Sequence, residues 1–377
     1  MAVEFKIEPI IEKKQEEMGE ISQNRTLYVG QFTNKVLMPE LFTEATSIQD
    51  VYNCFKPTEE AKIALETEYL TLDLFFKNAG QVDKGSLSII NVDKNDFKDS
   101  NSIYYKALTE EIDANYTNAN AYSLLVIPGD IFVDKCILFL YAQLAEKYGV
   151  LLISDYPDYP DFDSMMSDID KKGYADDYTA LQNVVMCCNW LLGRKKVNED
   201  DDLYIPPSGA LAGLLYNNKD ITISQSRAGQ MYGTIYESKD CRLHLLMAEV
   251  NILNDKLVIP MIYSKDRVMA FGDSTLYNGY NKMMQYYPTV RVLDWIKKTF
   301  INILNKDTFI NWNKYESPKI LKKYISDFLN KYKLFIDFRW LEAPYKDPIT
   351  EEIRLKIEIE PNFSAEKFSI ELISYNV

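Results

Sequence analysis

The sequence has a single histidine, His244, among its 377 residues. Histidine is the usual general acid or base near neutral pH, so a Ser-His-Asp triad would have to use this side chain. His244 stands in the apolar run 242–246, which favours a core or packing role, and no Gly-x-Ser-x-Gly motif is present to carry a nucleophile. We therefore predict no catalytic residue and a protein that is not an enzyme.

Cysteine is also scarce, and its spacing does not suit a disulfide framework or a zinc site. The five cysteines include no Cys-x-x-Cys pair, and only Cys187 and Cys188 are close in sequence. Buried thiols in a reducing compartment are the favoured interpretation. The aspartates from Asp155 to Asp170 lack the central glycine and terminal glutamate of a calcium loop. We therefore predict a solvated surface loop over 155–175 and no bound metal.

Nucleotide-binding motifs and long hydrophobic runs are missing as well. Neither a P-loop nor a Gly-x-Gly-x-x-Gly motif occurs, so we predict no cofactor. The net charge of −14 argues against nucleic acid or an anionic membrane surface as the main partner. No apolar run could cross a bilayer, and the first residues lack the apolar core of a signal peptide. We expect a chain that is not exported by a signal peptide, in agreement with the reducing compartment that its cysteines favour.

Strand and helix patterns alternate in the first half of the chain. Apolar runs typical of buried strands occur at 27–32, 87–92, 123–127 and 150–154. Helical patterns separate them, and this order predicts an α/β domain with a largely parallel sheet. Further patterns predict a helix at 177–192, a hairpin at 257–271, and helices at 283–304 and 318–332. The chain as a whole is therefore predicted to be of the α+β type.

Both ends of the chain alternate apolar and charged residues with the period of two that marks a half-buried strand. At the N-terminus the apolar positions are Val3, Phe5 and Ile7, and a charged linker follows. Towards the C-terminus they are Ile353, Leu355, Ile357, Ile359, Phe368, Ile370 and Leu372. A strand separated from the body by a linker must pair with a partner to bury its apolar face. We predict that both ends complete a sheet.

Two short motifs and their order point to a known family. The first comprises Pro206, Pro207, Ser208, Gly209 and Gly213, and the second, over 270–276, includes Gly272 and Asp273. With the earlier segments 27–32 and 43–51, they resemble the tail sheath proteins of contractile phages, tailocins and related injection systems. Phe271 and Ser274 replace a tryptophan and an arginine of that pattern. The resemblance to two-component secretion sheaths is weaker, because both arms and the body lie in one polypeptide.

The resemblance implies a structural subunit that forms stacked rings around an inner tube. Arms from neighbouring subunits would add strands to a sheet of the inner domain, which is β-augmentation used as a polymer joint. Contraction would then drive the tube through a target envelope without a nucleotide. The implied organisation is an N-terminal arm at 1–20, an outer α/β domain at 21–203, an inner α+β domain at 204–352 and a C-terminal arm at 353–377. The implied partners are other copies, the inner tail tube protein, and baseplate and terminator proteins.

A cluster of lysines on the predicted helix 318–332 is the clearest basic feature of this acidic chain. Lys319, Lys322 and Lys323 lie close together there. In the resembled family, a helix of the inner domain contacts the tube, so we hypothesise that these lysines make that contact. An ordinary solvated helix face is the alternative.

Two other interpretations of the whole sequence stay open. One is a baseplate or capsid interaction protein with exchanged strands at its ends. The other, which the absent motifs make weaker, is an α/β enzyme that acts on a small substrate.

Overall fold

The computed structural model describes residues 22–95, 99, 101–116, 120–132, 134–195, 201–217, 222–304, 312–332, 334–349, 353–361 and 368–374. The N-terminal positions Val3, Phe5 and Ile7 lie outside the described residues.

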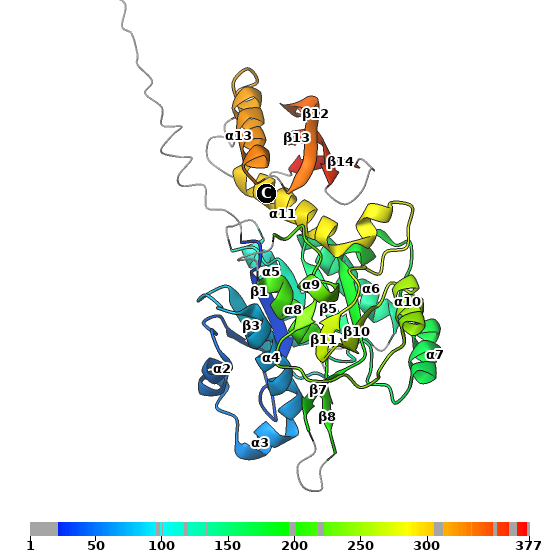
Figure 1. Ribbon diagram of the computed structural model, residues 1–377. Helices are drawn as coiled ribbons and strands as arrows, with labels where there is room; N and C mark the ends of the chain where they lie inside the picture. Colours follow the sequence, from blue (N-terminus) through cyan, green and yellow to red (C-terminus); the bar gives the residue numbers. More distant parts are fainter. Residues whose placement is uncertain are drawn as a thin grey trace, which may run out of the picture.

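A nine-stranded sheet forms the larger part of the molecule (Figure 1). In spatial order its strands are β2 (Glu40–Phe42), β3 (Leu87–Asn91), β1 (Thr26–Gly30), β4 (Leu124–Val126), β5 (Leu151–Asp155), β6 (Val184–Cys188), β10 (Ile259–Ser264), β11 (Arg267–Ala270) and β9 (Thr234–Ile235). The strands from β3 to β10 run parallel, while β2, β11 and β9 are antiparallel to their neighbours. The prediction of an α/β fold is confirmed.

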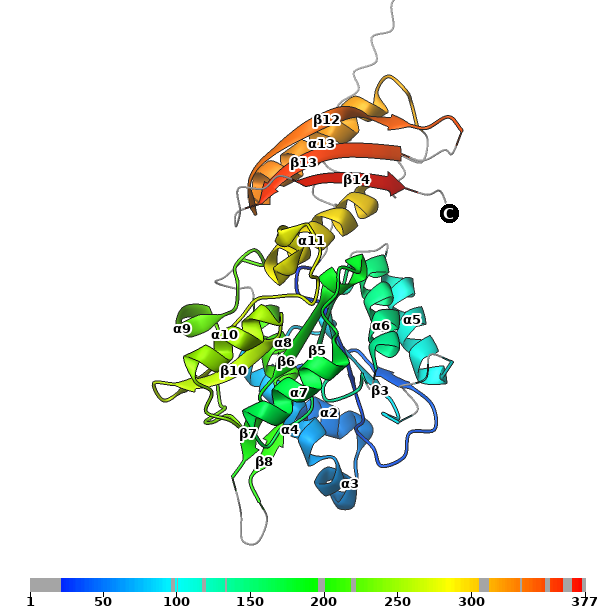
Figure 2. The same ribbon diagram turned by 90° about the vertical axis from the view of Figure 1, so that its right-hand side faces the viewer.

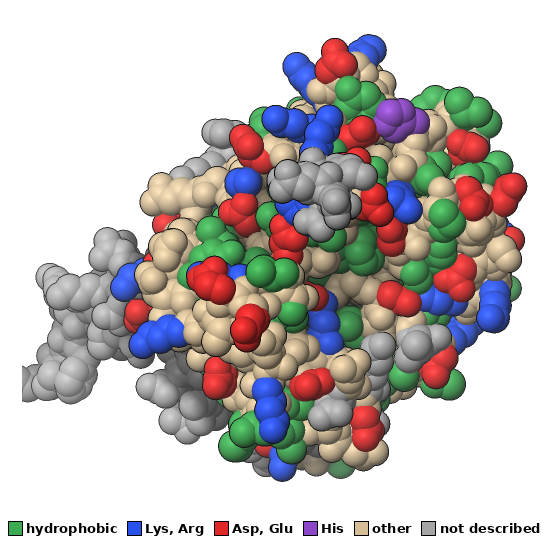
Figure 3. All heavy atoms as spheres, turned by 90° about the horizontal axis from the view of Figure 1, so that it is seen from below, with side chains coloured by type: hydrophobic (Ala, Val, Ile, Leu, Met, Phe, Trp, Pro, Cys, Tyr) green, Lys and Arg blue, Asp and Glu red, His purple; other side chains and the backbone are tan. Residues whose placement is uncertain are grey.

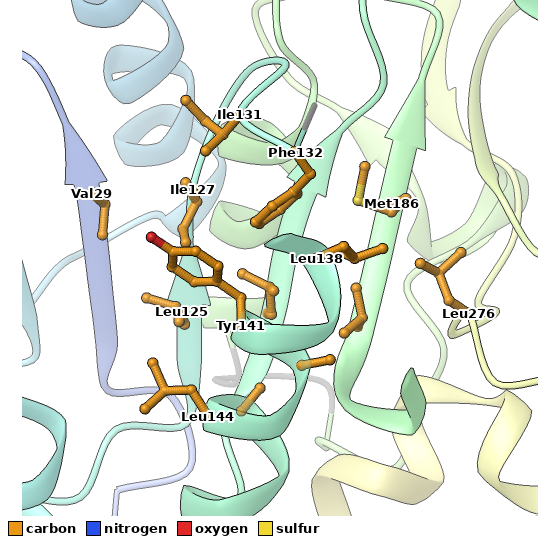
Figure 4. Close-up of a cluster of buried hydrophobic side chains, with 14 of the residues drawn as sticks. Val29, Leu125, Ile127, Ile131, Phe132, Leu138, Tyr141, Leu144, Met186 and Leu276 are labelled. Atoms are coloured by element: carbon orange, nitrogen blue, oxygen red, sulfur yellow. The ribbon is translucent and has the colours of Figure 1, made fainter. Parts of the chain in front are cut away.

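Helices cover both faces of this sheet, as parallel strands require. One face packs against α5 (Ile103–Asn115), α6 (Lys135–Tyr148) and α7 (Phe162–Lys172). The other packs against α2 (Ile48–Phe55), α4 (Glu66–Ala79) and α8 (Ser208–Tyr216), with α3 (Glu59–Ala64) leading into α4. Figure 4 shows the first of these two cores, where Tyr141 of α6 lies beside Leu125 and Ile127, and Leu138 of the same helix points toward Met186.

The predicted loop over 155–175 is wrong in part, because it contains α7. Asp161 caps that helix by accepting a hydrogen bond from the Ser164 N–H at 2.8 Å, and Gly173 ends it in the left-handed conformation. Met165 and Ile169 bury its inner face. Frequent aspartates therefore mark a helix start and a solvated face rather than a loop.

The predicted helix over 177–192 is wrong. The segment forms the 3₁₀ turn η2 (Thr179–Asn183), the strand β6 and the start of β7 (Leu191–Arg194), which pairs with β8 (Leu203–Ile205). All five residues of β6 are buried, because helices cover both faces of a central strand. A strand buried on both faces shows no alternation, so its pattern cannot be separated from that of a buried helix.

A second, smaller unit lies at one end of the molecule (Figures 1 and 2). It consists of α13 (Ser317–Tyr332) and a sheet of β12 (Phe335–Lys346), β13 (Ile353–Pro361) and β14 (Phe368–Ser374). The long helix α11 (Tyr287–Leu304) lies between this sheet and the nine-stranded one. Between β8 and α11 the chain also forms α9 (Gly229–Tyr232), α10 (Met247–Asp255) and the turn η3 (Lys282–Gln285).

The observed division of the chain differs from the expected boundaries. β10 and β11, the predicted hairpin, complete the nine-stranded sheet, so the boundary expected between residues 203 and 204 falls inside the larger unit. The expected C-terminal arm begins at β13, which belongs to the sheet of the smaller unit.

Only some of the cysteines are buried, and the single histidine is not. Cys187, Cys188 and Cys241 are buried thiols, as predicted, but Cys54 and Cys136 are exposed. His244 is not in the core: its ring is exposed, stacks on Tyr263 and lies with Nε2 2.7 Å from Asp240 Oδ1. On the face drawn in Figure 3 the histidine is surrounded by interspersed acidic, basic and hydrophobic side chains, with no area of one charge. None of the described helices is both long and apolar enough to span a bilayer.

Candidate assembly surfaces

Ser208 begins α8 and ties this helix to the end of β5. Its backbone N–H donates to Asp155 Oδ1 at 2.8 Å, and its hydroxyl donates to Asp155 Oδ2. The N–H of Gly129, which follows β4, donates to the same carboxylate at 2.9 Å. Burial raises the pKa of Asp155 to about 7, although these hydrogen bonds act in the opposite direction. Ligands of α/β proteins bind at the carboxyl ends of the strands, but here the start of α8 fills that place.

Gly209 and Gly213 let α8 lie directly on α4. A Cβ at Gly209 would lie 2.5 Å from the Thr71 carbonyl oxygen, and one at Gly213 would overlap that of Phe75. The two glycines are one turn apart on α8, as the two carbonyls are on α4, so backbone meets backbone along the crossing. The motif from Pro206 to Gly213 is therefore a packing joint inside the larger unit.

The second motif joins β11 to α11. The carbonyl of Asp273 accepts a hydrogen bond from the Tyr287 N–H at 3.0 Å, at the start of α11. A Cβ at Gly272 would lie 2.8 Å from Asn254 Oδ1 of α10. Burial raises the pKa of Asp273. Gly272 and Asp273 are thus also structural, at the junction of the two units.

Two buried cations on α11, which sequence reasoning missed, hold the units together. Arg291 donates to the carbonyl of Leu215 at 3.0 Å, near the end of α8. Lys298 Nζ donates to the carbonyls of Tyr122 at 2.7 Å and Gly149 at 2.8 Å, and Gly149 caps the end of α6. The C-terminal end of a helix carries partial negative charge, which favours a cation there. In the sequence, the one feature that indicates this role is the spacing of the two cations, seven residues apart on the same helix.

The C-terminal strand residues lie in a three-stranded sheet whose strands all come from this one chain. Ile353, Leu355, Ile357 and Ile359 are buried against α11 and α13, and their strand β13 pairs with β12 on one side and β14 on the other. Both edges of β13 are therefore occupied within one chain. In the backbone register, Phe368, Ile370 and Leu372 of β14 stand opposite Ile359, Ile357 and Leu355.

The two outer strands of this sheet differ in regularity. β12 has three register shifts against β13 and contains Pro344, which has no N–H to donate. β14 pairs with β13 without a shift, from Ser374 opposite Ile353 to Phe368 opposite Ile359. Within the described residues, β14 therefore offers the more regular edge.

The predicted tube-contact lysines lie on the outer face of α13. Lys319, Lys322 and Lys323 are exposed, whereas Leu321, Ile325 and Leu329 form the buried face of the helix. Lys322 also lies over the ring of Trp340, 5.6 Å from its centroid. The basic face is thus free to meet a partner, at the end of the molecule that carries the small sheet.

Comparison with known protein families covers most of the chain. The family model for the type VI secretion system TssC/VipB central domain matches residues 58–278, and that for the TssC/VipB-like C-terminal domain matches residues 286–376. This chain belongs to the TssC/VipB family. Its members are structural sheath proteins, so the chain is a structural sheath subunit and not an enzyme.

The resemblance to contractile sheath proteins is thereby confirmed for this TssC/VipB chain, but one part of it is corrected. In the sequence, the resemblance to two-component secretion sheaths is the weaker one, yet the model that matches residues 58–278 is of the type VI secretion system, and the second is of the TssC/VipB-like C-terminal domain. The change from one model to the next, between residues 278 and 286, coincides with the passage from the larger unit to α11.

Solved structures with this fold include sheath proteins. A sheath tail protein from Desulfitobacterium hafniense matches with a TM-score of 0.63 at 10% identity, over 100% of each chain. The helical sheath of the anti-feeding prophage in its contracted state matches with a TM-score of 0.63 at 15% identity, over 99% of this chain and 98% of that one. A sheath tail protein from Listeria innocua gives 0.64 at 10%, over 96% and 97%. None of the curated protein sequences matches this TssC/VipB chain.

Proposed function

We propose that this sheath subunit polymerises around an inner tube by exchanging strands with neighbouring copies, and that the polymer contracts to drive the tube through a target envelope. The observation that carries this proposal is the small sheet, whose regular outer strand β14 leaves one edge unpaired among the described residues. An unpaired edge is a template for another strand. The match to a helical sheath in its contracted state supports the same mode of assembly.

The incoming strand is, in this proposal, residues 2–8 of a neighbouring subunit. Val3, Phe5 and Ile7 supply one apolar face, and the strand would extend the sheet beside β14 rather than the bulged β12. Backbone hydrogen bonds of this kind hold subunits together while their bodies rotate, so the lattice stays connected as it contracts. The C-terminal positions 353–372 contribute by building the sheet that receives this strand.

Removing residues 1–20 is expected to abolish polymer and leave the body folded. The shortened chain keeps all the side chains that form the two described cores, from Leu27 to Tyr287. Negative-stain microscopy and sedimentation would measure polymer, and circular dichroism during heating would measure folding. Normal tubes or stacked rings from the shortened chain would rule out the N-terminal joint. A full-length chain that stays monomeric with its tube present would rule out the proposed function.

The basic face of α13 is proposed as the contact with the tube protein. Three exposed lysines on one face suit an acidic partner surface, and complementary charge chiefly sets association rate and register. Baseplate and terminator proteins are proposed as the partners at the two ends of the polymer, and a similar chain in an anti-feeding prophage baseplate supports the first of these.

Reversing the charges at Lys319, Lys322 and Lys323 to glutamate is expected to reduce sheath assembly on tube by about tenfold or more. The measurement is co-sedimentation with preformed tube. A matched control reverses three exposed lysines elsewhere, Lys84, Lys239 and Lys265, with the same change in net charge. If the two triple variants bind tube equally well, the lysines of α13 are not the contact.

A further inference from the structure

Tyr280 is a fully exposed aromatic side chain on a loop that is otherwise firmly held. The Asn278 N–H donates to the carbonyl of Asp176 at 2.7 Å, and the Thr275 N–H donates to that of Gln285 at 2.7 Å. The Asn281 side chain accepts from the Met283 N–H at 3.2 Å. The loop is thus closed at its base and fixed on both sides of the tyrosine. Because the backbone on both sides is already held, little backbone freedom is lost on binding, and an exposed tyrosine on such a loop suits the centre of an interface.

A pocket of about 250 Å³ lies beside β2, β3 and α5, near the β2 edge of the large sheet. Pro39, Leu41, Ile90 and Ala107 form apolar walls, and Glu110 and Glu111 add carboxylates. Ligand sites for small molecules start at about 300 Å³, so this pocket suits one inserted side chain better than a cofactor. Glu110 is exposed and forms only a solvated ion pair with Lys106 at 3.8 Å, while Glu111 accepts a hydrogen bond from the Tyr122 hydroxyl.

The surface around this pocket is unusually apolar. Leu37 and Met38 are 72% and 70% exposed, and Ile103, at the start of α5, is half exposed. Leu37 and Met38 precede β2, which is an edge strand of the large sheet, and Ile103 lies one turn before Ala107 on α5. Exposed apolar side chains beside a sheet edge favour a surface that a partner covers.

The tyrosine and the pocket cannot meet within one chain. The segment before Tyr280 is bound to β6 through the Leu276 N–H, which donates to the Val184 carbonyl at 2.9 Å. The pocket is built on β2 and β3, and β1, β4 and β5 lie between β3 and β6. Leu276 and Ile90 belong to the same core cluster, so both features border the same face of the sheet. Two different patches on opposite flanks of one subunit are what a head-to-tail contact between copies needs.

We propose that Tyr280 of one copy inserts into the pocket beside β2 of a second copy, an inference that rests on the proposed function as a polymerising sheath subunit. The ring packs between Leu41, Ile90 and Ala107, and the phenol hydroxyl donates to the carboxylate of Glu110. The exposed Leu37 and Met38 form the rim that excludes water. Because the contact is heterologous, it repeats from copy to copy and does not close a dimer.

Replacing Tyr280 with alanine is expected to raise the critical concentration for polymerisation by about tenfold, as for a central interface tyrosine. Tyr280→Phe keeps the ring and is expected to raise it by about threefold, from loss of one hydrogen bond. The matched control is Tyr236→Ala, which removes a tyrosine that is 62% exposed elsewhere on the same unit and should leave the value unchanged. Equal values for Tyr280→Ala and the unmodified protein would overturn the proposal.

Disulfide trapping tests the pairing directly. In a Cys54→Ser, Cys136→Ser background without exposed thiols, a Tyr280→Cys, Ala107→Cys chain should form a ladder of covalent oligomers on mild oxidation of the polymer. Each single cysteine variant should form no ladder. Covalent dimers alone, or no cross-link in a polymer seen by microscopy, would refute the head-to-tail contact and leave strand exchange standing. Failure of the unmodified chain to polymerise would instead refute the proposed function.

Discussion

Replacing Gly213 with alanine is expected to lower the free energy of unfolding by about 3–5 kcal/mol, which is at the upper end for a single added methyl group. The new Cβ would overlap the Phe75 carbonyl oxygen and lie 2.9 Å from the Cβ of Asn78. Both neighbours belong to α4, and α8 is buried along its whole length. The two helices would have to separate, which would open the core on that face of the sheet.

Helix propensity alone predicts a change in the free energy of unfolding of the opposite sign. In the interior of a helix, alanine is more favourable than glycine by about 1 kcal/mol, so propensity alone predicts a more stable protein. Gly85→Ala serves as a control, because a Cβ there meets nothing within 4 Å and only the positive φ of 78° opposes it. Urea unfolding of both variants measures the difference. A Gly213→Ala protein as stable as the unmodified chain would show that the helices can part at little cost.

The sequence shows the glycines at positions 209 and 213, but it does not show that they are contacts between two helices. Gly209 and Gly213 were singled out through the family resemblance, and nothing in their spacing names the helix they meet. The contact depends on α4, more than 130 residues earlier in the chain. Local patterns predict elements, whereas the partner of an element is decided by packing across the whole fold.

The same limit explains the wrong helix at β6 and applies to the C-terminus. The run Val184–Cys188 is apolar throughout, and only its place in the middle of the sheet makes it a strand. Alternation in 353–359 correctly indicated a half-buried strand with a buried apolar face. It could not indicate that β12 and β14 of the same chain pair with it on both sides. Period two identifies the face that is buried and leaves the neighbours unspecified.

Lys298 could not be recognised as buried, because a lysine on an amphipathic helix is normally solvated. It is 1% exposed, and its ammonium group donates to two carbonyls of the larger unit. Burial lowers the pKa of Lys298 to about 8, while the charge of Asp294, one turn earlier, acts in the opposite direction. Asp294 in turn accepts a hydrogen bond from Asn183 at 2.5 Å. At the junction, the ammonium group of Lys298 therefore donates to two carbonyls and lies one helical turn from the carboxylate of Asp294.

Replacing Lys298 with methionine is expected to cost about 3–5 kcal/mol at pH 7, because two buried carbonyls lose their donor and Asp294 loses its neighbouring cation. Methionine keeps most of the volume, so a cavity is not the cause. The matched control is Lys297→Met, which makes the same change of charge on the adjacent residue of α11. Chemical unfolding measures stability, and hydrogen exchange at residues 120–123 and 149–150 measures loosening at the junction. If Lys297→Met loses as much stability, the effect is one of net charge only.

The cost of Lys298→Met is also expected to grow as the pH rises from 8 to 10.5. In this range the folded protein has released the lysine proton, whereas the unfolded chain still holds it. A rise in pH favours the state that holds fewer protons, which here is the folded state. Lys298 therefore raises the free energy of unfolding of the unmodified protein by about 1.4 kcal/mol per pH unit, or about 3 kcal/mol over this pH range. The methionine variant lacks this gain. A difference between the two proteins that stays constant from pH 7 to pH 10 would mean that Lys298 remains charged in the fold, and that a buried ammonium ion, rather than a neutral amine, holds the two units of the sheath subunit together.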